Sequence, residues 1–138
     1  MEAVCQFEFD VPDAALDANG HVNNVAYLQW VQEAAIRHAE ASGCARITRA
    51  CGATWVVRAH RIEYLRPAFA GDKLRVQTWV ADLRKVRSLR RFKFTRLADD
   101  AVLAQGETDW VFVDALTRRP RAIPPDIRQA FQVAPDLK

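Results

Sequence analysis

The stretch Asp17-Ala18-Asn19-Gly20-His21-Val22-Asn23-Asn24 decides how the chain is organised, because it joins a short strand to a long helix. It is polar and contains a glycine, as turns do, and its two asparagines are of the residue type that caps helices. From Val25 to Ser42 the chain has strong helix formers with apolar side chains at helical spacing, and Gly43 stands where a C-terminal cap is expected. We therefore expect one helix of about 27 Å directly after the turn.

Alternating apolar and polar residues predict the strands around this helix. Before the turn, Phe7 and Phe9 share one face of a strand expected over residues 4–11. After the helix, four segments are rich in Val, Thr, Trp and Phe, and short connections between them favour antiparallel pairing. These segments are residues 53–65, 73–83, 86–97 and 101–113. The pattern predicts an α+β fold, with one long helix on one face of a five-stranded antiparallel sheet.

The segments between the predicted strands contain residues typical of turns and of helix starts. Gly71-Asp72 and Asp99-Asp100 are candidate hairpin turns, and Pro124-Pro125-Asp126 is expected to open a short terminal helix ending near Phe131. Several predicted strands carry apolar residues on both faces, as Trp55 and Val56 illustrate. One helix cannot cover both faces, so we expect the chain to self-associate.

Length and composition fit one globular domain over residues 1–138, since half of the residues are hydrophobic and 27% are charged. Three cysteines without close spacing argue against a disulfide framework. The first 30 residues contain five acidic side chains and no basic one, unlike a secretory or transit leader, and no apolar run approaches the length of a membrane span. We expect a cytoplasmic protein without membrane contact.

The net charge of +3 hides an uneven distribution along the chain. Residues 58–100 carry twelve basic and five acidic side chains, whereas residues 1–57 carry three basic and seven acidic ones. The basic run from Arg84 to Arg91 is consistent with a solvated face, with a patch for nucleic acid, or with a site for the phosphates of a small ligand. Phe92 and Phe94 follow at core spacing, which is a poor platform for stacking bases.

The turn quoted above also carries a family resemblance. With Val25-Ala26-Tyr27 it resembles the Asp-x-x-Gly-His-Val-Asn-Asn-x-x-Tyr signature of hotdog-fold acyl-CoA thioesterases of the 4-hydroxybenzoyl-CoA thioesterase-like branch. Two later stretches are similar to that family's strand after the helix and to its last strand and tail. They are Ile62-Glu63-Tyr64-Leu65-Arg66-Pro67 and Trp110-Val111-Phe112-Val113-Asp114 with Arg119-Pro120. The resemblance implies a sheet wrapped around the central helix and a dimer, with a tetramer of two dimers compatible with this branch.

The resemblance also implies roles for the motif. On local grounds alone, Asp17 reads as a turn or cap residue. By resemblance, its carboxylate attacks the thioester carbonyl or activates a water that does so, and the backbone N–H of Asn24 at the helix start stabilises the oxyanion. His21 takes an orienting or accessory role. The motif residues expected to line the substrate site are Gly20, Asn23 and Tyr27, although Asn23 is equally suited to capping the helix and Tyr27 to the core.

The remaining residues of the expected site bind the coenzyme A part of the substrate. The resemblance assigns its phosphates to basic and hydroxyl side chains of the run and of the tail, namely Arg84, Lys85, Arg87, Ser88 and Arg121. Arg58, His60 and Arg61 lie on the strand expected to cross the site, and their roles are open. The three histidines are too far apart in sequence to suggest a metal site, so we expect neither a metal nor a cofactor, coenzyme A being part of the substrate.

The sequence therefore predicts an enzyme that hydrolyses an acyl-CoA thioester to a carboxylic acid and coenzyme A. An acyl-carrier-protein thioesterase would use much the same residues. A hotdog module that binds acyl-CoA or nucleic acid without turnover is the alternative from another class. An (R)-specific hydratase fits less well, because its motif spaces the Asp and the His differently from Asp17 and His21.

Overall fold

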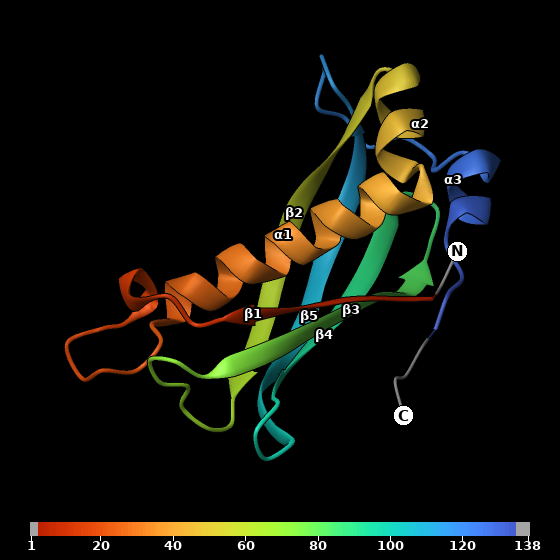
Figure 1. Ribbon diagram of the computed structural model, residues 1–138. Coiled ribbons are helices and arrows are strands. Elements are labelled where there is room, and N and C mark those ends of the chain that lie inside the picture. Colours follow the sequence, from red (N-terminus) through yellow and green to blue (C-terminus); the bar gives the residue numbers. More distant parts are fainter. Residues whose placement is uncertain (1–2, 135–138) are drawn as a thin grey trace.

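The computed structural model describes residues 3–134 and consists of two layers, a five-stranded sheet with a long helix packed on one of its faces (Figure 1). Five strands form a single antiparallel sheet in the order β1-β3-β4-β5-β2. The strands are β1 (Val4–Asp10), β2 (Ala53–Tyr64), β3 (Lys73–Leu83), β4 (Arg87–Arg96) and β5 (Ala101–Asp114). The helices are the 3₁₀ turn η1 (Asp13–Ala15), α1 (Asn24–Ser42), α2 (Cys44–Ala50) and α3 (Pro125–Ala130).

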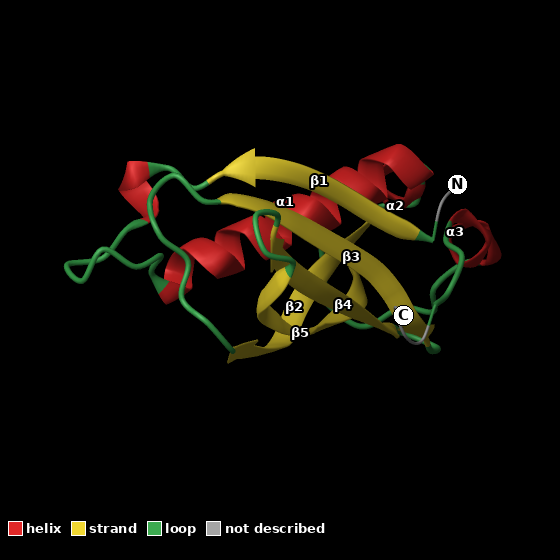
Figure 2. Cartoon of the chain, turned by 60° about the horizontal axis from the view of Figure 1, so that its bottom comes forward, coloured by secondary structure: helices red, strands yellow, loops and turns green. Residues whose placement is uncertain are grey.

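The long helix α1 crosses the inner face of the sheet, and the sheet curves around it (Figures 1 and 2). Its buried side includes Tyr27, Val31, Ala34 and His38, which is the wide apolar face that the sequence predicts. On the sheet, Phe92 and Phe94 are almost fully buried beneath the helix, so they are core residues as expected. The predicted α+β architecture with one central helix is confirmed.

Two details differ from the sequence prediction. The chain was expected to continue from Gly43 to a strand, but a second helix, α2, begins at Cys44. Gly43 does end α1, with a positive φ of 86° and its N–H donating to the Glu40 carbonyl. This left-handed residue turns the chain sharply, and the Ser42 Oγ then accepts a hydrogen bond from the Cys44 N–H, so a new helix starts at once.

The Gly71-Asp72 connection is not a hairpin, which corrects the second prediction. It joins β2 to β3, and these strands are separated in the sheet by β4 and β5. β3 instead pairs with β1 and β4, so the connection carries the chain across the sheet end. Asp99-Asp100 does join neighbouring strands, β4 and β5, as predicted.

β2 lies at one edge of the sheet and spans the length of the inner face. Near its start, the Trp55 indole N–H donates to the Thr48 Oγ1 of α2, and at its end the Tyr64 hydroxyl is 3.5 Å from the Asn24 carbonyl oxygen. The strand therefore runs from α2 to the beginning of α1. Within residues 3–134, no helix is long and apolar enough to cross a membrane.

Candidate active site

The polar loop before α1 holds the Asp17 carboxylate in a fixed position. Asp17 Oδ1 accepts hydrogen bonds from the Asn19 N–H at 2.9 Å and from the His21 N–H at 3.1 Å. The loop closes through the Asp17 N–H, which donates to the His21 carbonyl at 2.7 Å, and Gly20 supplies the positive φ of 76° that the turn requires. Oδ2 makes no hydrogen bond to any residue between 3 and 134, so it is available to a substrate or a water.

The start of α1 presents backbone N–H groups beside this loop. Asn23 is the N-cap: its Oδ1 accepts from the Ala26 N–H at 2.8 Å, and its Nδ2 donates to the Ala15 carbonyl at 2.9 Å. Both polar ends of this side chain are thus engaged, which favours the capping role over contact with substrate. The Asn24 N–H belongs to the first helical turn, has no acceptor in the described chain, and bears the partial positive charge of the helix start.

Two other motif residues have mainly packing contacts. The His21 ring lies edge-on to Phe69, with ring centroids 5.0 Å apart, while its backbone anchors Asp17. Tyr27 is 3% exposed and packs against Phe94 and Tyr64. Burial, the nearby Tyr64 and then Asp72 raise the pKa of the Tyr27 phenol to about 12. Tyr27 is therefore a core residue, as the sequence allowed, and not an acid at neutral pH.

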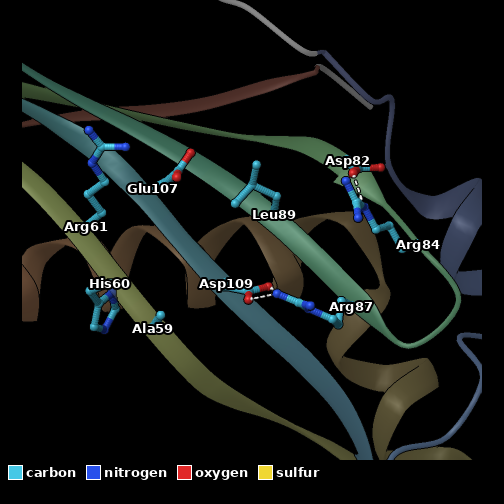
Figure 3. A pocket seen from close by; sticks show the side chains of 9 residues that line it. All are labelled: Ala59, His60, Arg61, Asp82, Arg84, Arg87, Leu89, Glu107 and Asp109. Carbon is cyan, nitrogen blue, oxygen red and sulfur yellow. Dashed lines mark hydrogen bonds and ion pairs between the residues drawn. The ribbon is translucent and has the colours of Figure 1, made fainter.

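The residues predicted to bind the coenzyme A phosphates lie on two different faces of the sheet. Arg87 and Ser88 are neighbours on β4, so their side chains lie on opposite faces of the sheet. On the outer face, Arg87 forms an ion pair with Asp109, and Arg84 pairs with Asp82 at 2.8 Å; both pairs line a cavity of about 290 Å³, which we call the outer cavity (Figure 3). Ser88 is buried on the inner face.

Arg84, Lys85 and Arg121 gather at one end of the molecule, where the β3–β4 turn meets the tail. The Ile123 N–H donates to the Lys85 carbonyl at 2.9 Å, and the Arg121 Nη1 donates to the Cys51 carbonyl at 2.9 Å. This end also contains the start of β2. Three of the five predicted phosphate ligands are thus brought together, close to α2.

A second cavity of about 350 Å³ lies between the sheet and the C-terminal half of α1, and we call it the inner cavity. Its walls are mostly apolar and come from α1, α2, the start of β2, β4, β5 and the tail. They include Ala35, Ala39, Cys44, Trp55, Trp110 and Phe131, with Ser88 and Arg90 on β4. Arg90 was not among the residues predicted from sequence to form the site. It stands two residues before Phe92 and four before Phe94, and this period-two spacing was the available signal, because it places Arg90 on the buried face.

The residues with open roles lie on the edge strand β2. His60 faces inward, its Nδ1 2.9 Å from the Thr108 Oγ1, and burial lowers the pKa of its imidazole. Arg61 lines the outer cavity, whereas Arg58 is exposed. In the described part of the chain, no group of three or more His, Cys, Asp or Glu side chains is placed to hold a metal ion.

The chain is similar in sequence to known thioesterases. The family profile of the thioesterase-like superfamily matches residues 11–131. The acyl-CoA thioester hydrolase YbgC of Escherichia coli O6:H1 is 29% identical over 119 residues, covering 84% of this chain and 87% of the relative. The L-carnitine dehydrogenase/betainyl-CoA thioesterase of Ruegeria pomeroyi is 32% identical over 121 residues, which are 88% of this chain but 24% of that protein.

A solved structure shares the whole architecture. The crystal structure of YbaW, a probable thioesterase from Escherichia coli, superimposes with a TM-score of 0.84 at 26% identity, covering 91% of this chain and 95% of the other. The five-stranded sheet around α1 and the match to thioester hydrolases identify a hotdog-fold thioester hydrolase. The chain belongs to the thioesterase-like superfamily.

Proposed function

We propose that the protein is an acyl-CoA thioesterase in which the loop before α1 carries out the chemistry. The single observation that carries this proposal is the carboxylate of Asp17, held by two backbone N–H groups immediately beside the free N–H groups of the α1 N-terminus. Acyl-CoA hydrolase relatives that match this chain over most of their length supply the substrate class.

The reaction follows from these two groups. The Asn24 N–H hydrogen-bonds the thioester carbonyl oxygen and stabilises the negative charge that forms on it. Asp17 either removes a proton from the attacking water or attacks the carbonyl carbon itself, and both routes require its ionised form. The C–S bond then breaks, and the coenzyme A thiolate leaves and takes up a proton. On the direct-attack route, water then hydrolyses the mixed anhydride left on Asp17, which releases the carboxylic acid and restores the carboxylate. His21 acts by holding the Asp17 carboxylate through its backbone. No step calls for a metal or cofactor.

Two copies are needed to complete the site. Neither cavity is lined by Asp17, and β2 is a twelve-residue edge strand with β5 on one side only. Exposed apolar side chains flank this edge, Val25 and Ile36 on α1 and Leu65 after β2. We propose that two β2 strands pair antiparallel about a two-fold axis, which closes the edge. A tetramer of two such dimers is compatible with this arrangement.

The two-fold pairing gives the predicted phosphate ligands a place in the site. Antiparallel pairing sets the end of the partner's β2, where α1 begins, against the start of this β2, where α2 and the basic end lie. We propose that Arg84, Lys85 and Arg121 bind the coenzyme A phosphates there, as exposed and partly exposed cations. The reducing cytoplasm, where acyl-CoA is made and used, is the proposed location.

A thiol-release assay over short, medium, long and aromatic acyl-CoAs tests the function. Asp17→Asn removes the charge while keeping the shape, and we expect turnover to fall by at least ~100-fold. Asp13→Asn, a matched change of an exposed acid on η1, should leave turnover unchanged. A wild-type protein that binds acyl-CoA without releasing thiol would support the binding module instead. Release only from acyl carrier protein would identify the carrier-protein thioesterase.

A further inference from the structure

The inner cavity is bordered by a positive charge that has no carboxylate partner in the described part of the chain. Arg90 is 6% exposed and borders the cavity from β4. Its Nη1 donates to the His38 Nδ1 at 2.9 Å and to the Thr78 Oγ1 at 3.3 Å, and both of these acceptors are uncharged, since a nitrogen that accepts from a guanidinium bears no proton. Between residues 3 and 134, no carboxylate lies within ion-pair distance of Arg90.

The charge persists at neutral pH. Burial lowers the pKa of the Arg90 guanidinium, but only to about 10. The Phe131 ring, 5.5 Å from the guanidinium carbon, provides a weak cation–π contact and no counter-charge. A buried cation without an anionic partner is strongly unfavourable, so proteins retain one mainly where a ligand supplies the partner.

A second donor at the same cavity has no acceptor in the described chain. The Trp110 indole N–H is buried and has no hydrogen-bond partner in the described chain. The Ser88 hydroxyl, opposite Trp110 on the neighbouring strand, can donate as well. Three donors thus border a cavity whose remaining walls are mostly apolar. This chemistry fits a ligand with a hydrocarbon body and an anionic, acceptor-rich end.

We propose that the inner cavity binds the acyl group of the substrate and that Arg90 recognises a carboxylate at the far end of that group. The preferred substrates are then ω-carboxyacyl-CoA thioesters, the monothioesters of dicarboxylic acids. This inference rests on the proposed thioesterase function and deepens it. A guanidinium can bind a carboxylate through two parallel N–H bonds, which gives direction as well as charge.

The cavity is reached from the partner's catalytic loop. It lies beside Ala35 and Ala39, eleven or more residues along α1 from Asn24, which is about 16 Å from the chain's own site. The two-fold pairing of β2 instead brings the start of the partner's α1 next to Trp55, at the cavity wall. A thioester held by one protomer can thus extend its acyl group into the other.

The same charge determines which substrates are rejected. A methyl-ended acyl group would leave Arg90 without a partner, and an acyl group ending in a quaternary ammonium, such as a betainyl group, would place two cations together. We therefore expect the carboxylate-ended substrate to be hydrolysed fastest and the cationic one slowest.

The test compares matched substrates on two variants. Glutaryl-, adipyl- and suberyl-CoA are assayed against valeryl-, hexanoyl- and octanoyl-CoA, with betainyl-CoA as the cationic member and with correction for spontaneous hydrolysis. Hydrogen bonds to charged groups predict that wild type favours the carboxylate-ended series in kcat/KM by about 10-fold or more. Arg90→Met should remove or reverse this preference while retaining hydrolysis of the methyl-ended series. Lys93→Met, on the outer face of the same strand, should keep the wild-type preference.

The outcomes separate this inference from the proposed function. Hydrolysis by wild type without preference for a terminal carboxylate, or an unchanged preference in folded Arg90→Met, overturns the inference and leaves the thioesterase standing. If wild type hydrolyses neither series, the proposed function fails, and titration with hexanoate and with uncharged hexanamide, followed by intrinsic tryptophan fluorescence, decides the inference alone. Hexanoate binding in excess of hexanamide supports it, and equal binding overturns it. If Arg90→Met does not fold, the wild-type preference and this titration decide.

Discussion

The inner and outer cavities of this sheet contain arginines from the same strand, β4, in opposite electrostatic states. On the outer face, Arg87 is paired with Asp109, and Arg84 from the adjoining turn with Asp82 (Figure 3). On the inner face, Arg90 is buried against His38 and Thr78, without a carboxylate in the described chain. Arg84 and Arg87 are exposed or partly exposed and each has a carboxylate partner, whereas the buried Arg90 has none within residues 3–134. The comparison indicates that the buried cation of the inner cavity calls for an anionic ligand as its partner.

The largest expected difference between the two faces is in packing. Phe94→Ala, on the inner face, removes a fully buried ring and should lower the free energy of unfolding by about 3–5 kcal/mol. Lys93→Ala, one residue away on the outer face, should change it by less than about 0.5 kcal/mol. Urea denaturation measures both. Equal losses would mean that the outer face is packed as tightly in solution as the inner one, as in an extensive interface between copies.

A smaller effect with the opposite sign is expected at the buried cation. Arg90→Met replaces an uncompensated charge with an apolar side chain of similar length, and this relieves more than the two lost hydrogen bonds cost. We expect the free energy of unfolding to rise by about 1 kcal/mol, while the selectivity of hydrolysis is lost. Thermal and urea denaturation without ligand measure the change. A fall of ~2 kcal/mol or more would show that Arg90 serves mainly to hold His38 and Thr78 in place.

The smallest effect depends on pH and concerns Tyr27 on the inner face. Because its pKa rises from 10 to about 12 on folding, the neutral phenol is favoured in the folded state. Its contribution to stability is complete below pH 10 and is lost as the pH rises towards 12. Tyr27→Phe should therefore lose less stability than wild type between pH 10 and 12. Its stability at pH 7 should be unchanged or slightly higher, because the Tyr27 hydroxyl has no partner within residues 3–134.

Tyr64→Phe provides the control for this pH dependence, since Tyr64 is the other tyrosine of the chain and is 42% exposed. Its removal should leave most of the alkaline loss in place. A profile of Tyr27→Phe that matches wild type would show that another group titrates in this range.

Local signals predicted most of the fold, together with the turn and the helix cap of the loop, whereas the catalytic role of Asp17 is implied by the family resemblance. Phe7 and Phe9 stand two residues apart with a polar residue between them, and apolar residues recur at helical spacing after Asn24. Each spacing is a structural period that the sequence displays directly. The glycine and asparagines of the loop predicted the turn and the cap, and Asn23 indeed caps α1. The short helix α2 was missed, because a left-handed Gly43 looks the same in sequence whether the chain leaves the helix or begins another one.

The sequence by itself determined the five strands, the long helix, their faces and the position of the Asp17 loop, because these depend on residues close together in the chain. Only the tertiary structure decided which cations have partners. Arg87, Ser88 and Arg90 are almost adjacent in sequence, yet one pairs with Asp109 on β5 and the other two border a cavity completed by α1 and α2. Burial and pairing depend on segments that fold onto the strand from far along the chain, so the run of charges does not contain them.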